Sequence, residues 1–145
     1  MNSIKKISFI FIIIALFIFT GFAIYTYETN SRLNTAKEVS EIKTDVLNQI
    51  LLAFDIEREH YYICDIESIN GKLSELYKDH KSISKLIYDE YYNEKYKKAS
   101  PTIILINKNL DDIILGFINK DNEKVCSTIS LNNNGEWERS LLIKR

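Results

Sequence analysis

Apolar residues are concentrated near the start of the chain. Residues 7–27 contain no charged side chain and consist mainly of isoleucine, phenylalanine and leucine. A helix of about 20 apolar residues is long enough to cross the hydrocarbon core of a bilayer, which is about 30 Å thick. Tyr25 and Tyr27 close the run, and aromatic rings favour the headgroup level of a membrane. The pattern predicts a transmembrane anchor over residues 7–27.

The same run also has features of a cleaved signal peptide. Two lysines precede it, and the small residue Ala23 offers a cleavage site. The run continues past this site to Tyr27, which favours a retained signal-anchor. Because the positively charged flank of a span stays in the cytoplasm, we predict a cytoplasmic tail of residues 1–6. Residues 28–145 are then a single extracytoplasmic domain, periplasmic or extracellular, of a single-pass protein of the inner (cytoplasmic) membrane.

Beyond the apolar run, apolar residues recur every three or four positions, which is the period of an amphipathic helix. The first series predicts a helix from about Thr29 to Tyr62. The second starts at Ile66 and ends before Pro101, because the residue preceding a proline leaves the helical conformation. We expect the two helices to form a long antiparallel hairpin with Cys64 at its turn.

The C-terminal part of the chain has the pattern of strands. Residues 102–118 keep a helical spacing after the possible N-cap Ser100, but their dense isoleucine favours two strands separated by a polar turn. Residues 125–131 and 137–143 flank Asn134-Gly135, a pair that supplies the positive φ angles of a tight hairpin turn. The predicted fold class is α+β, mainly α: an N-terminal transmembrane helix, a long helical hairpin and a small antiparallel sheet or hairpin.

The chain has two cysteines, Cys64 and Cys126, and both belong to the part predicted to be exported. In an oxidising compartment an isolated pair is most simply a disulfide. In the chain-entropy model, closing a loop of about 63 residues stabilises the fold by about 4 kcal/mol. We therefore predict a disulfide bond between them.

Residues with catalytic or metal-binding chemistry are few. On a helix, His60 and Cys64 would share one face with Glu57, a spacing that can hold a soft metal, but a disulfide would remove the thiolate. Asp111 and Asp112 are adjacent and point in different directions, as acidic residues in turns commonly do. No nucleophile motif or phosphate-binding glycine loop is present. The sequence predicts a protein that is not an enzyme and has no catalytic residues, metal or cofactor.

One aromatic pattern indicates a contact surface. Three tyrosines follow one another at intervals of four residues, with a fourth beside them and three lysines after them. If the helices form a hairpin, this end returns toward the membrane, where amphipathic rings and long lysines are favoured. We predict a membrane-interface or partner contact at Tyr88, Tyr91, Tyr92, Tyr96, Lys95, Lys97 and Lys98.

Charge narrows the functional classes. All 20 acidic residues and all but two of the 19 basic ones lie after Tyr27, so this part is mildly acidic and has no field that attracts nucleic acid. We predict a membrane-anchored interaction module of a bacterial-type envelope that binds another envelope or secreted protein. A holin- or antiholin-like lysis protein of phage type is an alternative. A ligand-sensing ectodomain that needs a signalling partner is another.

Overall fold

The computed structural model describes the backbone of residues 3–145 and the side chains of residues 16–145. The chain divides into two compact units, Met1–Ser40 and Glu41–Arg145. Helix α1 (Ser3–Phe54) accounts for the described part of the first unit and supplies the first helical turns of the second. The single domain predicted over residues 28–145 therefore starts earlier than the second compact unit does.

The predicted membrane anchor is corrected by the structure. Among the side chains that are described, no helix combines the length and the apolar character that a membrane span requires. Residues 16–27 are the part of the predicted anchor whose side chains are described, and they belong to helix α1. The predicted tail, residues 1–6, and residues 7–15 of the anchor lie outside the described side chains. The prediction of a single-pass inner-membrane protein with a periplasmic domain is wrong on this finding.

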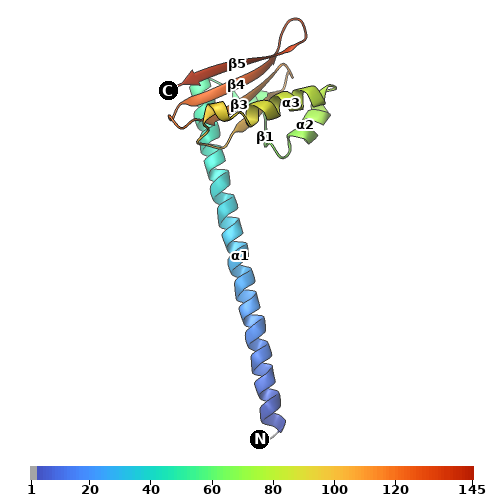
Figure 1. Ribbon diagram of the computed structural model, residues 1–145, viewed down its shortest axis with the longest axis vertical. Helices are drawn as coiled ribbons and strands as arrows, with labels where there is room; N and C mark the ends of the chain where they lie inside the picture. Colours follow the sequence, from blue (N-terminus) through green and yellow to red (C-terminus); the bar gives the residue numbers. More distant parts are fainter. Residues whose placement is uncertain (1–2) are drawn as a thin grey trace. The chain divides into compact units, whose positions relative to one another are not determined.

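The second unit is built on an antiparallel sheet whose five strands lie side by side in chain order (Figure 1). Residues 102–118 form two strands, as their isoleucine content favours, and the final pair is a hairpin in which Gly135 has a φ of 79°. This sheet is larger than the one predicted. Its strands are β1 (Tyr61–Cys64), β2 (Ile103–Asn107), β3 (Asp112–Ile118), β4 (Lys124–Leu131) and β5 (Trp137–Lys144).

The predicted long helical hairpin is wrong. Helix α1 ends at Phe54, and Asp55 takes a positive φ of 55°, after which a short 3-10 helix (Arg58–His60) leads into β1. The second predicted helix is divided into α2 (Ile69–Leu76) and α3 (His80–Tyr91), which lie against the sheet. The helical period was interpreted correctly for these two helices, but the surface that covers their apolar side is the sheet and not α1.

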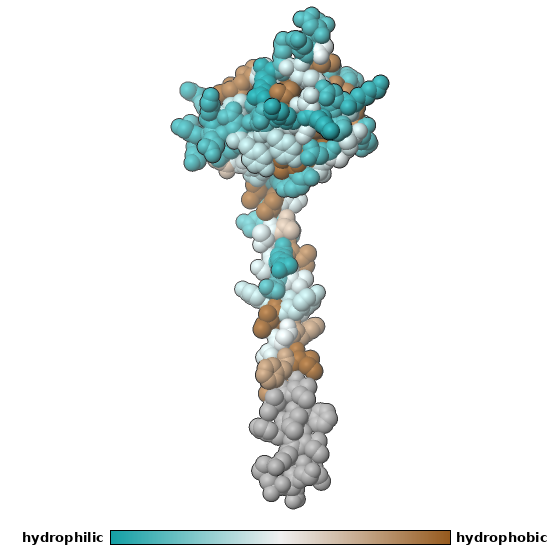
Figure 2. Space-filling view, turned by 45° about the vertical axis from the view of Figure 1, so that its right-hand side comes forward, coloured by the Kyte–Doolittle hydropathy of each residue, from teal (hydrophilic) through white to brown (hydrophobic). Residues whose placement is uncertain are grey.

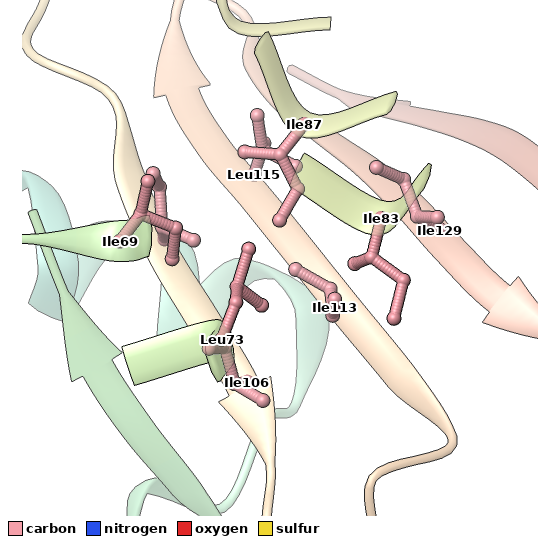
Figure 3. Close-up of a cluster of buried hydrophobic side chains, with 9 residues drawn as sticks. Ile69, Leu73, Ile83, Ile87, Ile106, Ile113, Leu115 and Ile129 are labelled. Carbon is pink, nitrogen blue, oxygen red and sulfur yellow. The ribbon is translucent and has the colours of Figure 1, made fainter. Parts of the chain in front are cut away.

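The sheet separates two apolar cores. On one face, α2 and α3 pack against the middle strands, and Figure 3 shows their side chains pointing into the same layer. On the other face, the last turns of α1 pack against the sheet through Val46, Leu47 and Ile50. Because successive residues of a strand point to opposite faces, fully apolar runs such as Ile103–Leu105 serve both cores.

Gly116 allows α1 to approach the sheet closely. A Cβ atom built on Gly116 would lie only 2.6 Å from Cγ2 and 3.1 Å from Cγ1 of Ile50, which is fully buried. The absence of a side chain at this position of β3 is therefore what makes room for Ile50 of α1.

The predicted disulfide is also wrong. Both cysteines are free, Cys64 half-buried and Cys126 buried. Cys64 belongs to β1 and packs in the α2–α3 core, whereas Cys126 belongs to β4 and packs in the α1 core. Two strands lie between theirs, and neighbouring strands are spaced by about 4.8 Å, so the Cα atoms are much farther apart than the roughly 7 Å that a disulfide allows. Sequence spacing could not reveal that the two side chains point to opposite faces.

Candidate functional site

A buried polar cluster joins the end of α3 to the sheet. Glu90 is only 2% exposed, and its Oε1 accepts hydrogen bonds from the hydroxyls of Ser127 and Tyr96. Its Oε2 lies 3.5 Å from Nη1 of Arg139 on β5, whose Nη2 lies 3.7 Å from a carboxylate oxygen of Asp89. A carboxylate is retained in the interior only with donors of this kind. The cluster fixes α3 onto β4 and β5.

The turn after α3 brings Tyr96 into this cluster. Asn93 accepts a hydrogen bond from the backbone N–H of Lys95 and so starts a second 3-10 helix (Glu94–Tyr96). Lys97 follows with a positive φ of 45°, which turns the chain back toward the sheet. Burial, and then the hydrogen bond to Glu90, raise the pKa of Tyr96 above its usual value. The hydroxyl of Tyr96 therefore acts as a donor to the buried carboxylate.

The predicted tyrosine stripe does not form one surface. Helix α3 ends at Tyr91, so Tyr96 lies on another element, where its ring packs on Phe117 at a centroid distance of 5.3 Å. Tyr88 is half-buried beside α2, and its ring stacks on that of Tyr92 at 6.1 Å. Only Tyr92 is largely exposed, at 65%. A contact of these tyrosines with a partner stays a prediction.

The three lysines of the same prediction are also separated. Lys95 and Lys97 are exposed, but Lys98 is half-buried. Its Nζ lies 4.8 Å from the ring centroid of Tyr91 and 4.9 Å from that of Phe117, and it donates to the Tyr91 carbonyl oxygen. Burial lowers the pKa of Lys98, and the charge of Glu90 partly offsets this. These contacts hold Lys98 against the interior, unlike the exposed Lys95 and Lys97.

The metal-binding candidate is only partly assembled. Nδ1 of His60 lies 3.1 Å from Oε2 of Glu57, and one ligand atom from each of Glu57, Glu59 and His60 falls within 4.8 Å of the others. These three side chains are exposed, and two of them, Glu57 and His60, border a hollow of about 550 Å³ beside Tyr61. Cys64 does not join them, because it packs in the α2–α3 core. Burial raises the pKa of both cysteine thiols, which makes them poor nucleophiles and poor metal ligands.

The two adjacent acids diverge, as their positions in a turn suggest. Asp112 begins β3 and accepts a hydrogen bond of 3.2 Å from the hydroxyl of Tyr61, while Asp111 is exposed. Burial raises the pKa of Asp112. Burial, followed by the charge of Asp112, raises the pKa of Tyr61 to about 12. Nearby, the hydroxyl of Tyr77 is buried and has no hydrogen-bond partner among the described residues. Burial, reinforced by the two aspartates, raises the pKa of Tyr77 to about 12.

We expect the Tyr77→Phe variant to be as stable as the parent protein at pH 7, or more stable by up to about 1 kcal/mol, because it removes a buried hydroxyl without a partner. Above pH 10 the two proteins should differ further. The folded-state pKa of Tyr77 lies above the value of 10 for an ordinary tyrosine. The stability that is linked to this shift is therefore fully present below pH 10 and is lost as the pH rises toward 12. Urea unfolding from pH 7 to 11.5 should therefore show a smaller alkaline loss for Tyr77→Phe.

Tyr61→Phe is the matched control. It removes the hydroxyl that donates to Asp112, so it should destabilise the protein at pH 7 by about 1 kcal/mol. A loss of stability at pH 7 for Tyr77→Phe equal to that for Tyr61→Phe would contradict the description of the Tyr77 hydroxyl as unpaired.

Exposed apolar side chains follow one another most closely on two elements, α1 and β5. In the first unit, large apolar residues from Leu16 to Val39 are exposed along α1, and Figure 2 shows such residues on its surface. In the second unit, three consecutive residues of β5 are exposed: Leu141 (44%), Leu142 (55%) and Ile143 (52%). Scattered apolar residues are common on protein surfaces, whereas contiguous apolar patches indicate binding surfaces. On β5, Leu141 and Ile143 lie on one face of the sheet and Leu142 lies on the other.

Comparison with known proteins gives no relative: no protein-family model, curated protein or solved structure matches this chain.

Sequence reasoning missed both the Glu90 cluster and the exposed strand. A signal for the first exists, because Glu90 follows Ile83 and Ile87 on the apolar side of its helix, where an acid needs buried donors. A signal for the second exists in the three consecutive apolar residues of the last strand, since a strand covered on one face shows alternation.

Proposed function

We propose that the protein is a non-enzymatic interaction module that binds another protein through helix α1 of its first unit. The observation that carries this proposal is the exposure of the large apolar side chains between Leu16 and Tyr27, which ranges from 60% to 78%. They are Leu16, Phe17, Ile18, Phe19, Phe22, Ile24, Tyr25 and Tyr27.

The distribution of these residues around the helix supports a partner that encloses it. Leu16, Phe17, Ile18 and Phe19 are consecutive, and each step along a helix turns by about 100°, so together they face all directions. A helix that is apolar all round is stable when other elements bury it. Several helices of a protein partner would cover it in this way.

After Tyr27 the apolar surface becomes narrower. Polar and charged residues dominate, and the large apolar side chains that remain exposed in the first unit are Leu33 (63%) and Val39 (44%). This composition fits a helix in contact with a partner on one side and with water on the other.

The second unit gives chemical support for a non-enzymatic role. Its buried carboxylate is paired with donors that fix α3 to the sheet, and its two thiols have raised pKa values. Its exposed histidine lies beside two exposed carboxylates and has no buried side chain that would orient it for catalysis.

The proposal is tested by photo-crosslinking in cells that produce the full chain. A photoreactive phenylalanine analogue replaces Phe22, which is 67% exposed, and in a separate strain Ser31, an exposed polar position on the same helix. We expect a discrete protein adduct, identified by mass spectrometry, at Phe22 and little or none at Ser31. Adducts to lipid alone, or equal protein adducts at both positions, would contradict the proposal.

A further inference from the structure

Strand β5 forms an open edge of the sheet. It has eight residues and pairs only with β4, and within the described part of the chain no strand lies on its outer side (Figure 1). Natural sheets usually protect such an edge with a proline, a bulge or inward-pointing charges. Here β5 pairs with β4 in unbroken register from Trp137 to Lys144, and three of its residues, Leu141 to Ile143, are apolar and exposed.

The backbone groups available on this edge follow from the hydrogen bonds of β4. The N–H of Leu131 donates to the carbonyl oxygen of Asp111, toward β3, so Leu131 does not bond to β5. Hydrogen-bonded and non-hydrogen-bonded pairs alternate in an antiparallel ladder. Trp137 is the partner of Leu131, so the outward-pointing backbone groups of β5 belong to every second residue from it: Trp137, Arg139, Leu141 and Ile143.

We propose that β5 pairs in antiparallel orientation with β5 of a second copy of this chain, so that the two sheets become continuous across a twofold axis at Leu141. A twofold axis places the same surface of both copies in contact. With Leu141 on the axis, outward-pointing backbone groups of both strands meet, and Leu141 of one copy lies opposite Leu141 of the other.

Charge complementarity selects this register. It places Glu138 of each copy opposite Lys144 of the other, on the sheet face that α1 covers. In one copy, Glu138 Oε1 accepts a hydrogen bond of 2.6 Å from Nδ2 of Asn132, and Lys144 Nζ donates one of 2.6 Å to the carbonyl oxygen of Ala53. Pairing of two copies exchanges these contacts for ion pairs across the axis. An axis at Arg139 would instead place two arginines opposite each other, and like charges in that position are destabilising.

The opposite edge explains why pairing would stop at two copies. Strand β1 has only four residues, and two lysines lie over the ring of its Tyr62: Nζ of Lys72 at 4.5 Å and Nζ of Lys108 at 5.7 Å from the centroid. A short edge strand whose side chains are covered by residues of other elements is protected against further strand addition. The assembly therefore closes as a dimer and does not grow into a fibre.

The register is tested with the full chain by disulfide trapping. In the Leu141→Cys variant the two new thiols face each other across the axis, at the Cα separation of about 5.5 Å that suits a disulfide. Mild oxidation should give a band of two chains on a non-reducing gel. Leu52→Cys, at an apolar position of α1 that is 86% exposed, is the control and should stay mostly monomeric.

A charge-reversal series tests the same pairing without a covalent bond. Sedimentation equilibrium of the full chain should show that Glu138→Lys and Lys144→Glu each raise the dimer dissociation constant by roughly tenfold, because each places like charges opposite one another. The double variant should restore the parent value. Circular dichroism confirms that each variant is folded.

Three outcomes would overturn the proposal. In the first, the Leu141→Cys variant is folded but forms no disulfide dimer. In the second, Leu52→Cys is trapped as a dimer to the same extent as Leu141→Cys. In the third, the double charge variant has a dimer dissociation constant as high as those of the single variants. Adducts of the first unit with a partner protein do not affect these readouts, so failure here leaves the proposed function intact.

Discussion

Replacing Gly116 by alanine should lower the free energy of unfolding by about 2 kcal/mol, within the range for overpacked cores. The new methyl group would lie 2.6 Å from Cγ2 of Ile50, which is closer than real Cβ atoms approach, and 3.3 Å from its Cβ, which is a tight contact. Ile50 is fully buried between α1 and the sheet, so it cannot turn away into solvent. Denaturant unfolding followed by circular dichroism measures the change.

Two further variants separate this effect from the general effect of a glycine substitution. Gly71→Ala, in α2, adds a methyl group with no atom within 4 Å and should stabilise the protein by up to about 1 kcal/mol, because alanine favours a helix. In an Ile50→Ala background, Gly116→Ala should cost much less, since Cγ1 and Cγ2 are absent. An unchanged cost in that background would show that the two residues do not meet.

Replacing Ser127 by alanine should destabilise the protein by about 2 kcal/mol, as expected for loss of a hydrogen bond to a charged group. Ser127 is 1% exposed and donates to the Glu90 carboxylate, which is itself buried. Without that donor, Oε1 of Glu90 keeps only the hydroxyl of Tyr96. Thermal and urea unfolding at pH 7 measure the loss.

The control for this substitution is Ser74→Ala, because Ser74 is exposed and donates only to the Gly71 carbonyl oxygen one turn earlier. Its stability should change by less than about 0.5 kcal/mol. The Ser127→Ala and Glu90→Leu substitutions together should cost less than the sum of the two single changes, since the acceptor that Ser127 serves is then gone. Strict additivity would mean that the two side chains do not interact in solution.

Much of the local structure could be predicted from sequence. Dense isoleucine in residues 102–118 indicated strands, and Asn134-Gly135 indicated the last hairpin, because both signals depend on neighbouring residues. Periodicity also marked the apolar side of α3, with Ile83 and Ile87 buried as it requires.

The predicted packing of the helices was wrong because periodicity identifies the apolar side of a helix but not the element against which that side packs. The first predicted helix continued to about Tyr62 and placed Cys64 at a turn, yet Tyr61–Cys64 pairs with β2 as an edge strand. With Cys64 in a strand, its side chain points to one face of the sheet and that of Cys126 to the other. The predicted disulfide rested on export into an oxidising compartment and on sequence spacing, neither of which reports which face of a sheet a side chain occupies. The predicted tyrosine surface depended on a hairpin of long helices and changed with it.

The buried cluster and the open edge depend on relations between distant residues. Glu90 and Ser127 are separated by 37 positions and meet only when α3 lies on β4. The exposure of Leu142 depends on β5 being the last strand of the sheet. No local pattern contains that information, although an acid within an apolar series and three consecutive apolar residues in a strand are reasons to look for it.

The strand order has a consequence for how quickly each part of the sheet can form. Strands β2 to β5 are joined by loops of four or five residues, whereas β1 and β2 are separated by the segment that holds α2 and α3. Bringing the ends of a longer loop together costs more conformational entropy, and distant pairings slow folding. The four-stranded meander should therefore belong to the folding nucleus, and β1, with the end of α1 that precedes it, should join after the rate-limiting barrier.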